Sequence, residues 1–315
     1  MELAVITAEK ISVMFVMALI GMICCRIGLI SGHTNEKFSD ILLLLVSPLL
    51  IFTSYQQAFD PEKLYGLLTA FFMAAVSHAV AITLASFLVK KGRTDWEVER
   101  ISAIYSNCGF MGIPLVSALF GADGVFYATA YITVFNILVW THGVILMTGK
   151  QDFKSFLTAL RSPCIIAVVL GLFCYLARIR FPAVILEPLT AIADMNTPLA
   201  MLVAGVSIAG SDIKALLMKV QIYYICAIRL LIIPTVVLLV LKAFRLDDMV
   251  TTVVVLATAC PTATTGTLFA LKFHRNSGYA SEIFGLATAS SIVTIPLMML
   301  LCGLINGLGL SCSRN

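Results

Sequence analysis

Charged residues are scarce in this chain. Only 12% of its 315 residues are Asp, Glu, Lys or Arg, whereas a soluble domain carries about 25%, and 60% of its residues are hydrophobic. This balance excludes a soluble globular protein and predicts an all-helical integral membrane protein that sits in the lipid bilayer. The net charge of +4 gives no reason to expect a nucleic-acid partner, because in a membrane protein it bears mainly on which loops face the cytoplasm.

Several catalytic and metal-binding motifs are also missing. The chain has no HExxH zinc motif and no GxxxxGK[ST] phosphate loop, so it does not hydrolyse ATP by a P-loop mechanism. Its nine cysteines show no CxxC spacing and are predicted to be small apolar core residues. No Asp or Glu lies deep in the apolar segments that carry the polar motifs, which removes the usual ligands of sodium and calcium. We therefore expect no metal, no cofactor and no enzymatic activity.

Long apolar runs take the place of charge. A transmembrane helix needs about 20 apolar residues, and the connectors between the runs leave no room for a soluble domain. The N-terminal run is too long for a cleaved signal peptide and lacks a small-residue cleavage site, so it is predicted to be the first span. The ten predicted spans are 5–30, 38–58, 64–89, 101–120, 124–147, 162–177, 187–209, 221–242, 249–271 and 281–305.

The two halves of the chain repeat weakly. Pro48 recurs as Pro198, 150 residues later, and Pro114 recurs as Pro261, 147 residues later. A nearly constant offset at separate places predicts an internal duplication. Because each half holds an odd number of spans, the second repeat must enter the membrane in the opposite sense. The predicted units are a first five-helix repeat at 1–147, a cytoplasmic connector at 148–161 and a second five-helix repeat at 162–315.

Basic residues are distributed unevenly between the two sides of the predicted membrane. Thirteen lie in the loops after odd-numbered spans and seven lie on the opposite side, and Arg229, inside an apolar segment, completes the 21. Cytoplasmic loops carry the excess of Lys and Arg, so the richer side is predicted to be cytoplasmic. We therefore expect a multi-pass protein of the cell membrane with both termini on the non-cytoplasmic side.

Two membrane-depth segments are interrupted at matching places in the two halves. They read SNCGFMGIPL at 106–115 and ATACPTATTG at 257–266. An unmade backbone hydrogen bond costs several kcal/mol in lipid, so a helix breaks there only where protein or water satisfies the freed groups. Such a pair of broken segments is the best sequence indication of a transporter's substrate site.

The residue types in these breaks suit a carboxylate ligand. Half-helix N-termini offer free N–H groups and a partial positive charge, while Asn and Thr side chains add uncharged donors. Prolines force the breaks and glycines allow close backbone approach. The alternative is ordinary helix packing, because Gly, Pro, Ser and Thr are common in membrane helices. The predicted site residues here are Asn107, Gly109, Gly112, Pro114, Pro261, Thr262, Thr264 and Thr265.

Four further polar residues in apolar segments are candidates, and each has a structural alternative. Arg229 is interpreted either as an anion-attracting charge or as a partner of helix-end carbonyls. His78, at the equivalent place in the repeat, is interpreted either as a proton-coupling group or as a packing residue. Asn136 and Ser291 either line the cavity or make interhelical hydrogen bonds.

Four motifs resemble those of a known family. SNCGFMGIPLVSALFG (106–121) and TAYITVFNILVWTHG (129–143) resemble the fourth and fifth spans of the auxin efflux carrier family, which includes bacterial malate-permease-like proteins; ACPTATTG (259–266) and SSIVTIPL (290–297) resemble its ninth and tenth spans. The resemblance implies ten helices in two inverted five-helix repeats, with helices 4 and 9 unwound and crossing beside an organic-anion site. It also implies an elevator-type movement and a homodimer. Thr264 and Thr265 are a departure, because family members often carry Asn in this stretch.

Three functional hypotheses follow. The leading one is a secondary carrier of a small organic anion, such as a dicarboxylate or an auxin-like carboxylate, bound between Asn107 and the helix ends at Pro114 and Pro261 and moved by alternating access. A sodium-coupled organic-anion symporter of the bile-acid-symporter type is the nearest alternative, and the missing deep carboxylates weaken it. An intramembrane enzyme is least favoured, because the chain has neither a zinc motif nor a deep pair of acids.

Overall fold

The regular secondary structure in the part that the structure describes is all helical, as the sequence predicts. The computed structural model describes residues 2–149, 160–209, 219–244 and 246–312, with side chains from 9 to 305, and contains no strand within these ranges. The first-half elements are α1 (Glu2–Arg26), α2 (Gly32–Ile41), η1 (Leu42–Val46), α3 (Ser47–Ser54), α4 (Pro61–Leu88), α5 (Trp96–Ile104), η2 (Cys108–Gly112), α6 (Ile113–Leu138), η3 (Val139–Gly143) and α7 (Val144–Thr148). The second-half elements are α9 (Pro163–Leu176), α10 (Ala183–Ala193), α11 (Asn196–Ala209), α13 (Val220–Ala227), η4 (Ile228–Ile232), α14 (Ile233–Ala243), α15 (Asp248–Ala259), α16 (Thr264–Lys272) and α17 (Ser277–Cys312).

Several of these helices suit a lipid bilayer. Among the described residues, six helical stretches are long and apolar enough to cross a membrane, and α9 and α15 are shorter apolar helices. The multi-pass membrane protein that the sequence predicts is therefore confirmed at this level, while ten spans in two inverted repeats stay a prediction. The six stretches are Gly32–Ser54, Pro61–Leu88, Cys108–Thr148, Ala183–Ala209, Val220–Ala243 and Ser277–Ile305.

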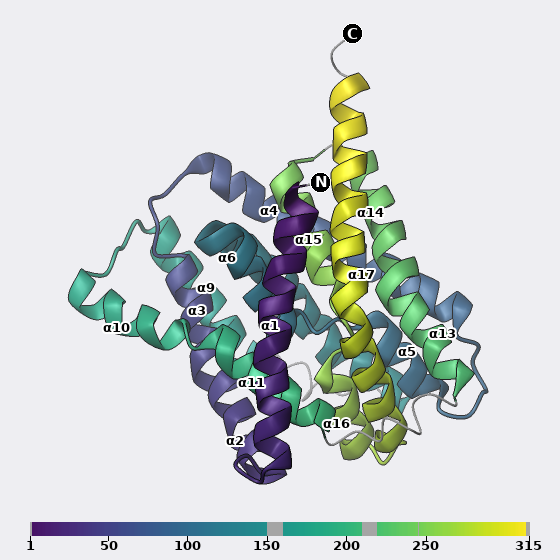
Figure 1. Ribbon diagram of the computed structural model, residues 1–315. Coiled ribbons are helices and arrows are strands. Elements are labelled where there is room, and N and C mark those ends of the chain that lie inside the picture. The colour runs from purple at the N-terminus through teal and green to yellow at the C-terminus, as the bar shows by residue number, and fades with distance from the viewer. Residues whose placement is uncertain (1, 150–159, 210–218, 245, 313–315) are drawn as a thin grey trace.

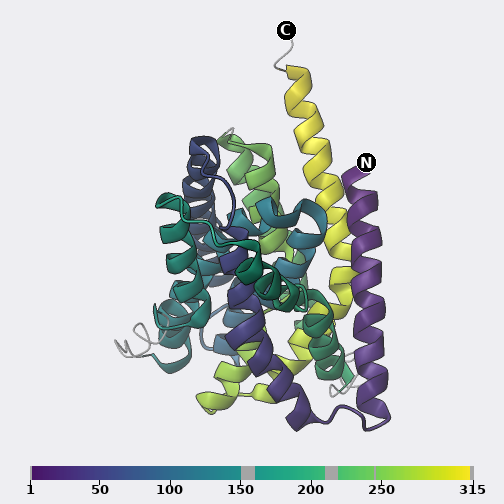
Figure 2. The same cartoon turned by 90° about the vertical axis from the view of Figure 1, so that its left-hand side faces the viewer.

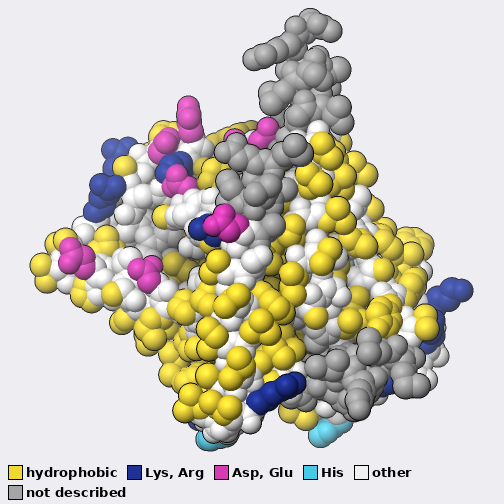
Figure 3. All heavy atoms as spheres, viewed as in Figure 1, with side chains coloured by type: hydrophobic (Ala, Val, Ile, Leu, Met, Phe, Trp, Pro, Cys, Tyr) yellow, Lys and Arg dark blue, Asp and Glu magenta, His cyan; other side chains and the backbone are white. Residues whose placement is uncertain are grey.

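The molecular surface carries the apolar band that such helices require. In the face shown in Figure 3, apolar side chains cover the middle of the molecule, and acidic side chains gather toward the upper end. Large apolar side chains such as Phe87, Phe173 and Val293 are mostly exposed. Aliphatic and aromatic side chains exposed over so wide a surface mark a membrane-facing region rather than a soluble one.

Three of the π-helical turns directly precede a proline. The turns η1, η2 and η4 are followed by Pro48, Pro114 and Pro234, each at the second position of the next helix. A proline inside a helix removes one N–H donor and clashes with the carbonyl four residues before it. A π-turn widens the helix at that point, so the chain stays helical through the proline instead of breaking.

A glycine divides the long helix α6 in two. Gly121 has φ of 59° and ψ of −149° inside the helix, a backbone conformation that favours glycine because it lacks a Cβ atom. The turn lies at the boundary predicted between segments 101–120 and 124–147. Segments that look continuous in length and hydropathy are therefore separate helical pieces here.

The long terminal helices lie side by side. Figures 1 and 2 both show α1 running next to α17, and α1 also packs against α11. The start of α1 and the end of α17 point to the same end of the molecule, while α2 and α16 lie at the opposite end. The elements α5, η2, α15 and α16 meet between these ends, so the two interrupted segments come together inside the fold.

Candidate functional site

The two interrupted segments pair with each other through their backbones. The Asn107 N–H donates to the Pro261 carbonyl at 2.7 Å, and the Ala263 N–H donates to the Tyr105 carbonyl at 2.9 Å. Ser106 and Thr262 thereby form an isolated antiparallel bridge. We call the place where these two segments pair the crossing. Each break supplies the hydrogen bonds that the other lacks, which is the condition for non-helical backbone at membrane depth.

The break in the first half lies several residues before the predicted proline. The chain is extended at Tyr105, and the non-helical stretch ends at Asn107, the cap of η2. Pro114 sits in the first turn of α6, directly after η2. The prediction that Pro114 forces the break is wrong, because the helix runs from η2 into α6 without interruption and the π-turn accommodates the proline. Pro261 does lie within its break, between the end of α15 and the start of α16.

Arg229 holds the ends of both broken helices. Its guanidinium lies in η4, is only 1% exposed and donates to the carbonyls of Ala103 and Ile104 at 3.1 and 2.9 Å, at the end of α5. It also donates to the Cys260 carbonyl at 3.1 Å and to that of Thr258, at the end of α15. Helix C-termini carry a partial negative charge, so a buried cation stabilises both at once.

The other ends of the breaks are helix N-termini. The Asn107 side chain accepts a hydrogen bond from the Phe110 N–H at 3.3 Å and so caps η2. Ala263 precedes α16 without a side-chain cap. Because the first N–H groups of a helix have no partner within it, both starts present backbone donors. The arrangement thus directs the negative helix ends to Arg229 and leaves the positive ends to a ligand.

A cavity of about 280 Å³ adjoins these helix starts. Apolar and aromatic side chains form most of its wall, including those of Phe110, Phe135 and Trp140, and uncharged polar groups complete it. None of the described residues that line it carries a charge. A concave, mostly apolar space with a few converging polar donors is typical of a small-molecule site.

Five of the twelve predicted site residues line this cavity: Asn107, Gly109, Asn136, Thr264 and Thr265. Asn136 donates its amide to the Ile132 carbonyl at 2.9 Å, so one of its two amide hydrogens is already used. The structure therefore brings together predicted residues from both halves of the chain.

Four other predicted residues build the crossing without lining the cavity. Thr262 donates its hydroxyl to the Ser102 carbonyl at 2.6 Å, and Pro261 contributes its carbonyl to the bridge. A Cβ atom on Gly112 would stand 3.4 Å from the Cys108 Cβ and 3.5 Å from the Cys260 sulfur, so this position is packed but not closed to a small side chain. Pro114 lies one turn farther along.

Ser291 and Arg229 also lie away from the cavity. Ser291 is buried in α17, donates its hydroxyl to the Thr288 carbonyl at 2.7 Å and borders a separate small hollow among α1, α11 and α17. For Arg229 the geometry favours the structural alternative, which is pairing with helix-end carbonyls. The Ser291 hydrogen bond stays within α17, so it matches neither of the two roles predicted for this residue.

His78 lies behind the wall of the cavity. It is 1% exposed, donates from Nδ1 to the Ala74 carbonyl at 2.8 Å, and its Nε2 has no hydrogen-bond partner among the described residues. Its ring centroid is 4.7 Å from that of Tyr131, whose hydroxyl shares a hydrogen bond of 3.2 Å with the Ser106 hydroxyl. Ser106 lines the cavity, so one tyrosine separates the histidine from the candidate site.

The cavity wall also contains residues that the sequence argument did not single out. Three of them, Ser106, Cys108 and Trp140, lie inside the motifs that resemble the family. Their position in those motifs was therefore a signal in the sequence. Leu43, Leu44 and Ser162 come from other elements, and no motif connects them to the crossing. Their place in the wall follows only from how α9 and η1 pack.

Comparison with known proteins finds similarity to membrane transport proteins over most of the chain. The sequence model of a family described as "Membrane transport protein" matches residues 6–154 and 152–299. An uncharacterized transporter of Methanothermobacter thermautotrophicus is 22% identical over 299 residues, which are 92% of this chain and 97% of that protein. The uncharacterized transporter YfdV of Escherichia coli is 24% identical over 228 residues, 69% of this chain and 71% of that protein.

Proposed function

The chain belongs to the membrane transport protein family, the auxin efflux carriers that its motifs resemble, and we propose that it is a secondary carrier of small organic anions. The observation that carries this proposal is the cavity beside the crossing, which is bordered by two helix N-termini and by no charged side chain among the described residues. Backbone N–H groups at helix starts bind a carboxylate without a fixed counter-charge. A transporter built this way can release its substrate again, because no buried ion pair must be broken.

The lining favours an anion with one carboxylate and an apolar body. Asn107, Thr264 and Thr265 supply polar groups near the helix starts, and the remaining wall is rich in aromatic and aliphatic side chains. A second carboxylate would have to be buried against this apolar wall, where an unpaired charge is strongly disfavoured. We therefore place an aromatic or branched monocarboxylate ahead of a dicarboxylate.

Alternating access fits a crossing that has a cavity on one side and packed aromatic side chains on the other. The cavity is bounded by the start of α9 and by α16, elements next to the loops that the distribution of basic residues assigns to the cytoplasm. On the other side, Tyr55 and Tyr175 pack against Phe126 with ring centroids 4.9 and 5.2 Å away. The Tyr55 hydroxyl also hydrogen-bonds that of Thr129 at 2.6 Å. We propose that this is an inward-facing state with the outer path closed.

A fold of two inverted five-helix repeats, at 1–147 and 162–315, and an elevator-type movement of a transport domain against a scaffold domain are part of the same proposal. The antiparallel bridge between Ser106 and Thr262 supports it, because it pairs equivalent breaks of the two halves in opposite directions. The two consecutive matches of the family's sequence model lend further support. A homodimer with both termini outside the cytoplasm completes the proposal.

Sodium coupling is the competing possibility, and Arg229 argues against it. A sodium site without carboxylates would have to use backbone carbonyls freed by the breaks. Those of Ala103, Ile104 and Cys260 already accept from the guanidinium. The Arg229 guanidinium thus occupies the position beside these carbonyls where a sodium ion would be most stable. His78, reached from the cavity through Tyr131 and Ser106, is the proposed proton-coupling group.

Uptake into liposomes tests the proposed function. Purified protein is reconstituted, and initial uptake is measured for a radiolabelled panel of aromatic, branched and dicarboxylic acids, with and without sodium and with a pH step. We expect saturable uptake of a monocarboxylate that Asn107→Ala reduces by about tenfold or more.

A matched control separates ligand binding from helix capping. Asn276 caps α17 by accepting a hydrogen bond from the Tyr279 N–H at 3.0 Å. It lies outside the cavity, so Asn276→Ala removes the same kind of helix cap without changing the candidate site. Uptake by Asn276→Ala should stay within about twofold of the wild type. Equal losses in the two variants would contradict a binding role for Asn107, and saturable uptake of dicarboxylates alone would overturn the proposed substrate class.

A further inference from the structure

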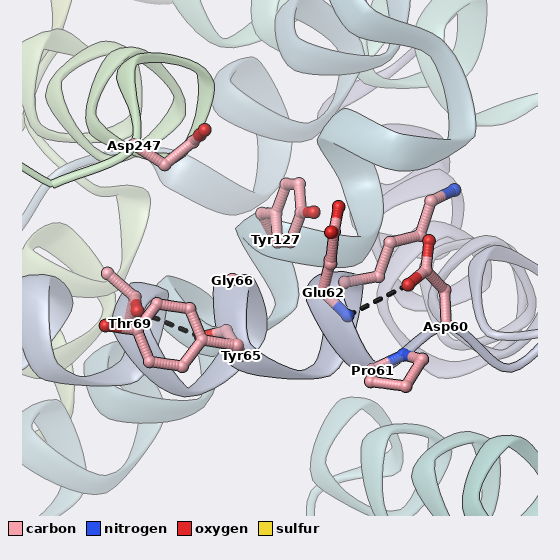
Figure 4. A pocket seen from close by; sticks show the side chains of 9 residues that line it. Asp60, Pro61, Glu62, Tyr65, Gly66, Thr69, Tyr127 and Asp247 are labelled. Atoms are coloured by element: carbon pink, nitrogen blue, oxygen red, sulfur yellow. Dashed lines mark hydrogen bonds between the residues drawn. The ribbon is translucent and has the colours of Figure 1, made fainter.

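A second and larger hollow lies among α4, α6 and the start of α15. Its volume is about 630 Å³, and it shares no lining residue with the cavity at the crossing. Figure 4 shows it from close by. Its lining residues are Asp60, Pro61, Glu62, Lys63, Tyr65, Gly66, Thr69, Tyr127 and Asp247.

The lining of this hollow is negatively charged. Asp60, Glu62 and Asp247 contribute carboxylates, and Lys63 is the one cation among the described lining residues. Lys63 donates at 2.5 Å both to the carboxylate of Asp123 and to the Gln57 amide oxygen. Because Asp123 already neutralises Lys63, the three lining carboxylates are left without a counter-charge in the hollow.

Tyr127 directs an unpaired hydroxyl into this hollow. The residue is 9% exposed, borders the hollow, and its hydroxyl has no hydrogen-bond partner among the described residues. Its ring packs so closely on α4 that a Cβ atom on Gly66 would stand 2.9 Å from Cε1 and 3.0 Å from the hydroxyl oxygen. The missing side chain at Gly66 therefore leaves the space that the ring occupies. A hydroxyl that opens into the hollow without a protein partner is available to a ligand as donor or acceptor.

The carboxylates are spread out rather than gathered. In Figure 4, Asp247 lies on one side of Tyr127, and Asp60 and Glu62 lie on the other. Among the described residues no three His, Cys, Asp or Glu side chains come close enough to hold a metal ion. Two negative ends with a tyrosine between them match an elongated cation with charges at both ends, whose alkyl chain packs on aromatic rings.

We propose that this hollow is a binding site for linear diamines and polyamines. One ammonium group binds Asp247, the other binds Asp60 and Glu62, and the Tyr127 hydroxyl accepts a hydrogen bond from the ligand. The site is distinct from the carrier cavity in residues and in charge, and its existence does not depend on the proposed transport of anions. It joins α4, α6 and α15, and α15 leads directly into the second break.

Direct binding to the full-length protein tests the proposal. Isothermal titration in lipid nanodiscs is performed with putrescine and spermidine, and with butylamine and MgCl2 at matched ionic strength as comparison ligands. Both amines with several charges should bind at least about tenfold more tightly than butylamine, because only they engage both ends. No binding of either, or equal binding of MgCl2, would overturn the proposal.

Three variants test the assignment of residues. Asp247→Asn keeps the cap that Asp247 provides to Val250, since Asn is an equally good capping residue, and should raise the Kd of spermidine about tenfold. Tyr127→Phe should raise it about threefold. Asp40→Asn, on the exposed face of α2, should leave it unchanged. Should Asp247→Asn fold poorly, Glu62→Gln serves in its place, and an unchanged Kd in either folded variant contradicts the site.

Discussion

Each carbonyl that Arg229 reaches lies at a helix end inside the protein. Without the guanidinium, the carbonyls of Ala103, Ile104 and Cys260 would lose the hydrogen bonds that it donates. Arginine suits the position better than lysine, because its planar group presents five donors in a fixed fork. The residue thus acts on the two breaks and only indirectly on the ligand.

Arg229→Gln is expected to destabilise the protein rather than to weaken anion affinity. Each carbonyl left unpaired costs about 1–3 kcal/mol, so the Tm in detergent should fall by at least about 5 °C, while the KM of the protein that survives stays close to that of the wild type. Thermal unfolding and liposome uptake measure the two quantities. Arg26→Gln, at an exposed helix end, is the control. A raised KM at unchanged Tm would instead support an anion-attracting role.

Glu99 in α5 is a buried carboxyl near the predicted cytoplasmic end. Its Oε1 accepts from the Tyr279 hydroxyl at 3.1 Å, and its Oε2 has no partner among the described residues. Burial raises the pKa of Glu99 above the usual carboxyl range, against the opposing influence of Tyr279 and Arg93. The folded state therefore prefers the protonated form, and stability falls as pH rises from the ordinary pKa through the raised one.

Glu99→Gln should remove this pH dependence. The amide resembles the protonated carboxyl, so the variant should be more stable than the wild type at neutral pH and equally stable at acidic pH. Tm measured between acidic and neutral pH in detergent checks this. Glu282→Gln, whose carboxylate pairs with Lys219 at 2.6 Å, should show no such gain. A wild-type Tm that rises with pH relative to Glu99→Gln would contradict the argument.

At the scale of elements, the two prolines of the matching motifs have different roles. Pro261 lies in the break between α15 and α16 and restricts the residue before it to extended backbone, whereas Pro114 lies inside the first turn of α6. Pro261→Ala permits α15 to continue, which withdraws the Ala263 N–H from Tyr105. We expect it to reduce uptake by about tenfold or more, with Pro114→Ala within about twofold of the wild type.

Membrane insertion must be shown for both proline variants. Equal yields of monodisperse protein after purification would demonstrate it. Comparable uptake by the two variants would contradict different roles for the two prolines. Loss of uptake in Pro114→Ala alone would support the sequence prediction that Pro114 forces the first break.

The sequence predicts which segments are interrupted better than where they are interrupted. Gly, Pro and Thr in two apolar runs were sufficient to locate the crossing, and five predicted residues line its cavity. The position of the first break could not be predicted, because hydrogen bonds between Asn107 and Pro261 and between Tyr105 and Ala263 fix it. The partners of Arg229 could not be predicted either, because every residue has a backbone carbonyl and the sequence does not indicate which carbonyls accept.

At the scale of the whole molecule, Arg229 is the one buried Lys or Arg among the described residues, and it is held in place. Arg229 is held by both broken helices, and the cavity wall carries no charge among its described residues. We therefore expect uptake to be unchanged when all sodium is replaced by N-methylglucamine, with KM and maximal rate within about twofold. A potassium-for-sodium exchange at constant ionic strength is the control. A fall of more than about fivefold without sodium would favour the symporter of the bile-acid type.

The position of Arg229 also sets an order for biosynthesis. Its partners at Ala103 and Ile104 are synthesised earlier, whereas those at Thr258 and Cys260 emerge from the ribosome only later. When η4 reaches the membrane, half of the guanidinium's acceptors do not yet exist, and an arginine at that depth costs roughly 2.5–3.5 kcal/mol on insertion scales. The nascent second half must therefore remain beside the already inserted first half until α15 is complete.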